Sequence, residues 1–114
     1  MKMIKQELID YSENRCGGSG TIKVHQFLDR DDMQGCGLGC TRLVFPVGAS
    51  IGVHQHADSV EQYYVISGKG IFYDNGIDKE ITAGQIGVMN PNCYHGIANT
   101  GDCEMVVIAV HLFA

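Results

Sequence analysis

The sequence predicts an all-β fold in which short antiparallel strands form a closed barrel or two packed sheets. Roughly eight to ten short segments have the alternating or continuously apolar pattern of strands. Turn residues, above all Gly and Asn, separate these segments. No stretch repeats apolar residues at the i, i+3, i+4 and i+7 positions that an amphipathic helix needs. A closed arrangement is favoured because it removes exposed strand edges.

Composition limits the classes of function. The 114 residues correspond to one domain, and 45% are hydrophobic and 18% charged. The net charge is −5 and the eight Lys and Arg residues are scattered, which argues against nucleic-acid binding. No apolar run approaches the roughly 20 residues of a membrane span, and the N-terminus does not resemble a signal peptide. Five cysteines, an odd number, favour reduced thiols and a cytoplasmic location.

The N-terminal part of the chain is expected to hold one clear strand. Residues 1–14 form either a short first strand or an arm that lies on a partner. The glycine-rich segment 17–20 is interpreted as a loop, because no Lys-Ser or Lys-Thr pair follows it as in a phosphate-binding loop. The segment Thr21–Leu28 alternates as a strand does, with His25 opposite the side formed by Ile22, Val24, Gln26 and Leu28.

The remaining strands follow from apolar runs bounded by turn residues. Asn75-Gly76 lies between two such runs and is a strong hairpin signal, because both residues tolerate a positive φ. The last strand is almost entirely apolar, so we expect both of its faces to be buried. The expected strands are Cys40–Phe45, Ile51–His56, Glu61–Ile66, Ile71–Tyr73, Lys79–Thr82, Gln85–Met89, His95–Ala98 and Glu104–Phe113.

A cluster of candidate metal ligands lies near the middle of the chain. His54 and His56 are two residues apart in an expected strand, so both project from one face. Glu61 follows a bend and can return a carboxylate to the same space from the next strand. His95, in a second stretch with its own turn residues, is a fourth candidate. Imidazoles and a carboxylate held on rigid strands are a ligand set for a divalent first-row metal.

These residues also stand at the spacings of a known family. The segment from Gly48 to Gly68 reads Gly-x5-His-x-His-x4-Glu-x6-Gly and resembles the first motif of the cupins. Gly84, His95 and Asn99 resemble the second motif. The chain is similar to small single-domain bacterial cupins of the conserved-barrel, mannose-6-phosphate isomerase-like kind. This resemblance indicates the fold more strongly than the reaction, because cupins support many chemistries.

The resemblance implies a cupin-type jelly-roll β-barrel, or double-stranded β-helix. Residues 41–114 would form the barrel core, and residues 1–40 an N-terminal arm, first strand and loop of the same domain. The second motif departs from the family at Asn90 and Asn92, where the family commonly has Pro and Gly. Asn tolerates the left-handed backbone conformation, so we expect Asn92 to replace the glycine.

The resemblance further implies one divalent ion, Mn, Fe, Co, Ni, Cu or Zn, held by His54, His56, Glu61 and His95. Open coordination positions would admit water, substrate or dioxygen. Tyr63 should share the face of Glu61, where it could line the pocket or act as a catalytic residue in proton transfer.

Two functions stay open at this point. One is a metal-dependent enzyme, an isomerase, oxygenase or decarboxylase, acting on a sugar, sugar acid or carboxylate. The alternative is a non-catalytic module that binds or senses a small ligand or a metal. A sugar-phosphate isomerase would want an inward basic cluster, and only Arg42 and Lys69 lie near the motifs. Small cupins are commonly dimers, which implies a homodimer with residues 1–11 as the exchanged strand.

Other chemically active residues have simpler explanations. His25 and His111 lie outside both motifs, and we expect core or interface positions for them. Cys36 and Cys40 have a spacing that zinc permits, but no second pair accompanies them. Cys93 is expected to be a small buried side chain near the pocket mouth.

Overall fold

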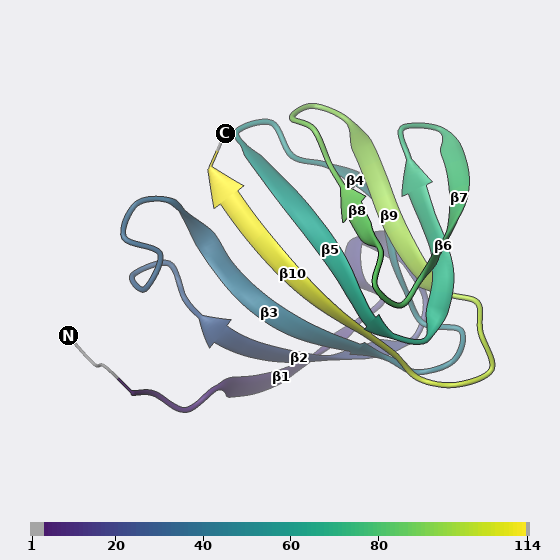
Figure 1. Cartoon of the computed structure of the whole chain (residues 1–114), viewed down its shortest axis with the longest axis horizontal. Helices are drawn as coiled ribbons and strands as arrows, with labels where there is room; N and C mark the ends of the chain where they lie inside the picture. The colour runs from purple at the N-terminus through teal and green to yellow at the C-terminus, as the bar shows by residue number, and fades with distance from the viewer. Residues whose placement is uncertain (1–3, 114) are drawn as a thin grey trace.

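The computed structural model describes residues 4–113 and confirms the all-β prediction (Figure 1). Ten strands are joined by turns, and a single 3-10 turn, η1 (Arg15–Gly17), follows the first strand. The strands are β1 (Leu8–Glu13), β2 (Thr21–Leu28), β3 (Gly37–Phe45), β4 (Ser50–Gln55), β5 (Ser59–Ser67), β6 (Lys69–Asp74), β7 (Ile77–Thr82), β8 (Ile86–Val88), β9 (Tyr94–Asn99) and β10 (Met105–Phe113).

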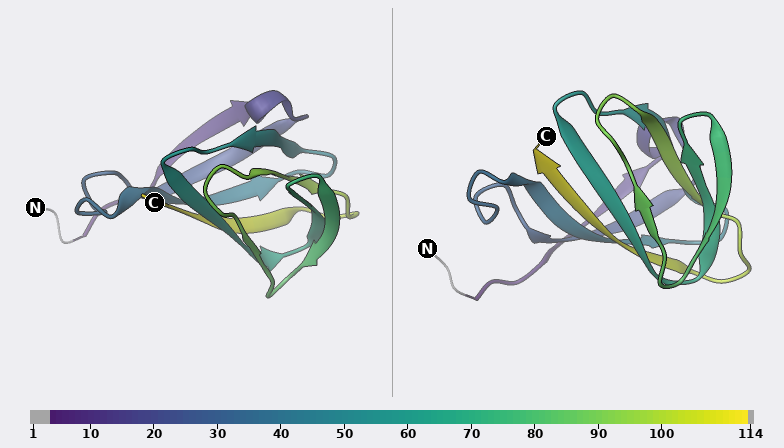
Figure 2. Two further views of the ribbon diagram at one scale, coloured as in Figure 1. Left: turned by 90° about the horizontal axis from the view of Figure 1, so that it is seen from above. Right: turned by 45° about the horizontal axis from the view of Figure 1, so that its top comes forward.

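Two antiparallel sheets face each other in a jelly roll (Figure 2). One sheet has the strand order β1-β2-β3-β10-β5-β8, and the other has the order β4-β9-β6-β7. Because β4 and β5 belong to different sheets, the short segment between them carries the chain from one sheet to the other. Apolar side chains from both inner faces form the core, including Ile22, Leu43, Phe45, Ile51, Val65, Phe72, Ile97, Met105 and Val107.

The N-terminal segment extends the six-stranded sheet. Strand β1 pairs with β2 of the same chain, from Leu8 opposite Gln26 to Glu13 opposite Thr21. For residues 1–14 we expected either a short first strand or an arm on a partner. In the described part, Leu8–Glu13 forms the strand. Leu8–Tyr11, which we expected to be exchanged with a partner, already has a partner strand within its own chain. Residues 1–3 of that expected strand lie outside the described residues.

Strand β10 is buried on one face only, which corrects the expectation of two buried faces. Met105, Val107 and Ala109 are fully buried, whereas the alternate residues Val106 and Ile108 are only partly buried. Within residues 4–113, no further sheet packs on the outer face of the six-stranded sheet. Large apolar side chains on neighbouring strands are exposed there as well, among them Tyr64, Ile66, Ile86 and Val88.

Two turns have the backbone conformation that the sequence predicts. Asn75 and Gly76 have φ of 47° and 93° between the paired strands β6 and β7. Positive φ at both central residues gives a hairpin turn whose twist matches that of the strands. Asn92 has φ of 65°, which confirms that it takes the left-handed conformation. That conformation shapes the turn before His95.

The glycine-rich loop packs closely on β4 and fixes the position of η1. Ser50 N–H donates to the Ser19 carbonyl at 2.8 Å, and Ser19 N–H donates to Ser50 Oγ at 2.9 Å. A Cβ atom on Gly18 would collide with the Ser50 carbonyl oxygen, and one on Gly52 with that of Cys16. The two segments approach this closely because glycine has no side chain. Strand β4, which carries His54, is thereby tied to η1.

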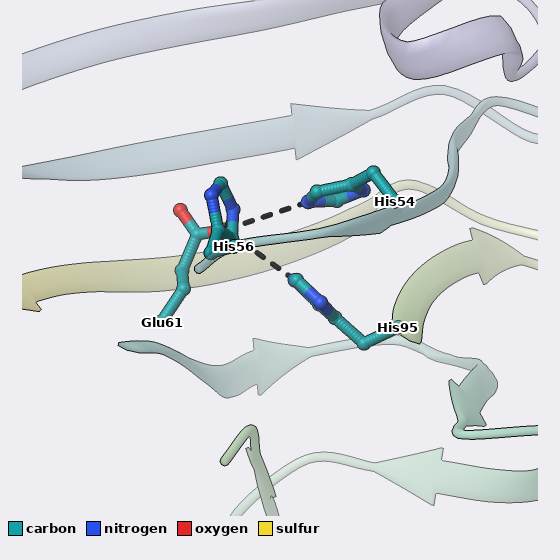
Figure 3. Close-up of side chains that lie close together, drawn as sticks. All are labelled: His54, His56, Glu61 and His95. Atoms are coloured by element: carbon teal, nitrogen blue, oxygen red, sulfur yellow. Dashed lines mark ion pairs between the residues drawn. The ribbon is translucent and has the colours of Figure 1, made fainter. Parts of the chain in front are cut away.

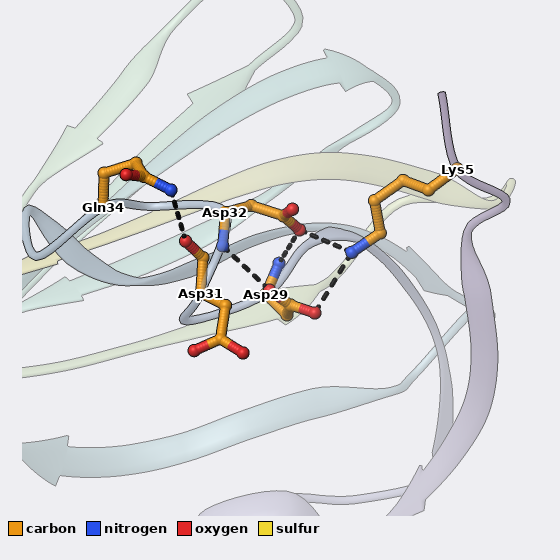
Figure 4. A network of polar contacts seen from close by, with 5 residues as sticks. All are labelled: Lys5, Asp29, Asp31, Asp32 and Gln34. Carbon is orange, nitrogen blue, oxygen red and sulfur yellow. Dashed lines mark hydrogen bonds and ion pairs between the residues drawn. The ribbon is translucent and has the colours of Figure 1, made fainter. Parts of the chain in front are cut away.

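The polar loop after β2 is tied to the N-terminal arm by one lysine. Lys5 Nζ donates to Asp29 at 3.1 Å and to Asp32 at 2.5 Å (Figure 4). The backbone N–H of Asp32 and the Lys5 ammonium lower the pKa of Asp29 to about 2. These groups are exposed, so the ion pairs position the arm more than they stabilise the fold.

None of the helical turns in residues 4–113 has the length and apolar character that crossing a bilayer requires. The five cysteines are free thiols among the described residues. Cys36 is exposed and Cys40 is buried, and neither belongs to a group of metal-binding side chains in the described part of the chain. The zinc alternative for this pair therefore gains no support.

Candidate metal centre

The four predicted ligands come together between the two sheets. His54 lies on β4, His56 directly after it, His95 on β9 and Glu61 on β5. His54 and His95 are direct cross-strand partners, whereas Glu61 comes from the facing sheet. Their candidate ligand atoms all lie within 4.8 Å of one another. Figure 3 shows the imidazoles of His54 and His95 pointing toward the Glu61 carboxylate.

The three imidazoles surround one oxygen of Glu61. Oε1 lies 3.6 Å from Nε2 of His56, 3.6 Å from Nε2 of His95 and 4.0 Å from Nε2 of His54. These distances are longer than hydrogen bonds, so the nitrogens face the carboxylate without being bonded to it. The side chain of His95 is 1% exposed and that of His56 is 25% exposed. The cluster is therefore closed on the His95 side and accessible from the His56 side.

Three ring nitrogens of this cluster are buried without a hydrogen-bond partner in residues 4–113. Nε2 of His56 and both ring nitrogens of His95 have no partner among the residues that the structure describes. Leaving a buried polar atom unpaired costs about 1–3 kcal/mol. A metal ion bound by Nε2 of both rings would remove most of this cost. The unpaired nitrogens of His56 and His95, together with the Glu61 carboxylate, therefore fit a bound metal ion.

A contact with the backbone orients the His54 imidazole as a metal ligand would be oriented. Its Nδ1 lies 2.7 Å from the Gly52 carbonyl oxygen. Because a carbonyl only accepts, Nδ1 carries a proton, and Nε2 is the nitrogen that faces Glu61 and has a free lone pair in the neutral ring. A metal-binding histidine typically donates its second ring N–H to such an acceptor, which fixes the tautomer and the ring orientation.

Tyr63 is the hydrogen-bond partner of the Glu61 carboxylate. Its hydroxyl donates to Oε1 of Glu61 at 2.8 Å, and the residue is 1% exposed. Burial and the neighbouring Glu61 raise the pKa of Tyr63 well above 10, so the hydroxyl remains a donor. The predicted position of Tyr63 on the same face as Glu61 is what the structure shows.

The ionisation of the cluster favours a bound cation. Burial alone would raise the pKa of Glu61, but His54, His95 and Tyr63 outweigh it and hold that pKa well below its usual range. Burial lowers the pKa of His56. Burial also acts downward on His54, but Glu61 and the Gly52 carbonyl raise the pKa of His54 above 6.5. Near pH 7 the cluster therefore has an ionised carboxylate and at least one neutral imidazole.

His111 lies beside the ligands without joining them. Its ring centroid is 4.6 Å from that of His56, and its Nε2 is 2.8 Å from Ser59 Oγ. It pairs with Glu61 across β10 and β5, and burial lowers its pKa. It is half-buried, lies outside the apolar core and borders a cavity, so the structure does not show the expected core position. His25, by contrast, is bonded to Glu7 far from the cluster.

A small cavity adjoins the centre, and one of its residues was missed by sequence reasoning. Glu61 lines this cavity of about 130 Å³ together with Arg15, Gln26, Leu38, Gly39, Thr41, Ala109 and His111. Sequence reasoning considered only Arg42 and Lys69, which lie near the motifs. Arg42 instead contacts Glu7 and His25. Arg15 stands 39 positions before His54, so its place beside the motif residues could not be seen in their spacing.

Three imidazoles and one carboxylate suit Mn, Fe, Co, Ni, Cu or Zn, and on a six-coordinate ion they leave positions open for a ligand. A metal so bound supplies positive charge that polarises a carboxylate or lowers the pKa of bound water. The chain thus offers both a ligand set and an adjacent cavity.

Comparisons with known proteins agree with this arrangement. The cupin domain matches residues 41–111. A protein of Thermotoga maritima named oxalate-binding protein is 34% identical over 97 residues, which cover 85% of this chain and 80% of that protein. A crystal structure of a predicted oxalate decarboxylase from Thermotoga maritima superimposes with a TM-score of 0.92 and 30% identity, covering 95% of this chain and 94% of the other.

More distant matches extend the likeness. An uncharacterized protein of Methanocaldococcus jannaschii is 26% identical over 108 residues, covering 95% of this chain and 85% of its own. The domain match over residues 41–111 and the 34% identical relative show that this chain belongs to the cupin family, and its jelly-roll fold agrees.

Proposed function

We propose that this cupin binds one divalent transition metal through His54, His56, Glu61 and His95, and that the metal binds a small carboxylate such as oxalate. The observation that carries the proposal is the set of buried Nε2 atoms of His56 and His95, which face Glu61 without a hydrogen-bond partner in residues 4–113. A cation at that point would satisfy them and the ionised Glu61 together.

The ligand class rests on the relatives and on the shape of the interior. One relative carries the name oxalate-binding protein, and one similar structure is described as a predicted oxalate decarboxylase. The cavity of about 130 Å³ beside Glu61 has room for a small carboxylate. Tyr63 and the Gly52 carbonyl hold Glu61 and His54 in place, so the ligand set is organised before the metal arrives.

Catalysis is the second candidate function, and His111 is the observation that favours it. Its imidazole borders the cavity beside Glu61, and its lowered pKa leaves it neutral at pH 7 and able to accept a proton. Proton transfer by Tyr63 stays a prediction, since its hydroxyl is engaged with Glu61. Consumption of oxalate by metal-loaded protein, lost in His56→Ala, would separate an enzyme from a binding module.

Replacing one ligand tests the metal site directly. In His56→Ala, metal affinity should fall by more than about 100-fold, because even residues behind the ligands are worth about 10–100-fold. The measurement is elemental analysis of purified protein followed by calorimetric titration with Mn²⁺, Ni²⁺ and Zn²⁺. His25→Ala is the matched control and should bind metal as the wild type does. Equal metal content in both variants would contradict the proposal.

The hydroxyl of Tyr63 should matter for metal binding. Tyr63→Phe keeps the buried ring but removes the donor to Glu61, so we expect metal affinity to fall by about 10–100-fold. Titration of the same metal into both proteins measures the loss, and circular dichroism confirms that the barrel is intact. An unchanged dissociation constant would show that Tyr63 serves only to fill the core.

Metal affinity should rise with pH around neutrality. The raised pKa of His54 means that this imidazole holds a proton above pH 6.5, and binding must displace it. Each displaced proton changes the apparent affinity by about tenfold per pH unit below that pKa and has no effect above it. Titrations from about pH 5.5 to pH 8.5 should show a slope that flattens at the high end. A flat profile would refute this competition.

We also propose that two copies form a homodimer. The apolar outer face of the six-stranded sheet, with Tyr64, Ile66, Ile86 and Val88 exposed, supports association through that face. Sedimentation equilibrium at micromolar concentration should give twice the chain mass of 12.4 kDa. A mass of one chain, unchanged on tenfold concentration, would overturn the dimer.

A further inference from the structure

We propose that Arg15, with Gln26 and Thr41, forms an anion subsite beside the metal centre. This subsite receives the far carboxylate of a ligand whose near end is at the metal, so that the protein selects small dicarboxylates over monocarboxylates. The inference rests on the proposed function above and adds the residue that sets ligand specificity.

A single cavity connects the metal centre, where one end of the proposed ligand binds, with Arg15, where the other end binds. Glu61 belongs both to the ligand cluster and to the lining of the cavity of about 130 Å³, and Arg15 lines the same cavity. At about 30 Å³ per water molecule, the cavity has room for roughly four waters. A two- or three-carbon dicarboxylate fits in that space.

Arg15 has no anionic partner in the described part of the chain. The residue is half-buried, yet none of the ion pairs within residues 4–113 includes its guanidinium. Its charge reaches the interior: burial lowers the pKa of His111, and Arg15 is among the charges that lower it further. A half-buried guanidinium facing a cavity is suited to a planar carboxylate, which it binds through two parallel hydrogen bonds.

One further carboxylate of the chain, that of Asp10, lines a cavity together with Arg15. Asp10 and Arg15 both line a second cavity toward β1, but they form no ion pair. Oδ1 of Asp10 instead accepts the backbone N–H of Tyr11 at 2.8 Å. Glu61, which shares the cavity with Arg15, is already engaged by Tyr63. The guanidinium therefore remains available to an anion that enters from solvent.

The remaining walls fit the same ligand. Gln26 and Thr41 are cross-strand partners on β2 and β3, so their amide and hydroxyl stand side by side on the inner face. Both groups donate hydrogen bonds, whereas Leu38 and Ala109 provide apolar walls. Arg15 itself is held in position because the glycine-rich loop is bonded to β4, the strand that carries His54. The backbone that carries Arg15 is thus fixed beside β4.

The test compares two ligands on metal-loaded protein. Oxalate and acetate are titrated calorimetrically into the full-length chain loaded with Mn²⁺, as wild type, Arg15→Gln, Arg15→Lys and Arg42→Gln. A charged hydrogen bond is worth about 1.5–3 kcal/mol, so Arg15→Gln should weaken oxalate binding by about 10–150-fold. Acetate binding should change by less than about twofold, because acetate does not reach the subsite. Arg15→Lys should recover part of the loss, and Arg42→Gln should match the wild type.

A second measurement does not depend on the variants. Phenylglyoxal modifies accessible arginines, and mass spectrometry measures the rate at each site. In the wild-type protein, oxalate should slow modification of Arg15 and acetate should not, while Arg30 and Arg42 serve as internal references. Removing the carboxylate of Asp10 in Asp10→Asn should leave oxalate affinity unchanged or raise it.

The outcomes separate this inference from the proposed function. If Mn²⁺ or oxalate fails to bind the wild type, the proposed function falls and the subsite falls with it. The subsite alone is overturned if oxalate binds the wild type and Arg15→Gln weakens the binding of oxalate and acetate equally. The same holds if Arg15→Gln weakens the binding of neither ligand. Metal affinity measured in Arg15→Gln should equal that of the wild type, and a loss there would also count against the subsite.

Discussion

The structure depends on one buried carboxylate, that of Glu61, and on what surrounds it. An ionised acid in a protein interior is costly unless it is paired and hydrogen-bonded. Here the Tyr63 hydroxyl supplies one bond, and three imidazoles supply partial compensation at distances too long for hydrogen bonds. The imidazoles are too far from Glu61 to form a hydrogen-bonded ion-pair network with it. The same four side chains nevertheless provide a full set of candidate metal ligands. This difference is the physical reason for assigning a metal to the centre.

The jelly roll brings that carboxylate and its partners together from separate sheets. His54 and His95 pair across β4 and β9, while Glu61 approaches on β5 from the opposite sheet. The cluster adjoins the small cavity that Glu61 and Arg15 line. The proposed metal ligands lie on strands or directly after one, whereas the cavity wall includes Arg15 from a short turn packed on β4.

Much of this arrangement was accessible from the sequence because it is local. The alternation of β2 and the Asn75-Gly76 hairpin depend on neighbouring residues, and both were predicted correctly. Asn92 could be assigned a left-handed conformation because few other residues tolerate it. The four ligands were grouped by their spacing. The structure places their side chains together, and metal binding itself stays a proposal.

The amino-acid sequence by itself determined the strands, their turns and the identity of the four clustered side chains, because these follow from period-two patterns and fixed spacings. Only the tertiary structure decided the role of residues that lie far away in the chain. Arg15 reaches the cavity because Gly18 and Gly52 let η1 approach β4, and no spacing rule expresses that contact. The half-exposed outer face of β10 has the same origin, since an apolar strand does not reveal whether another layer covers it.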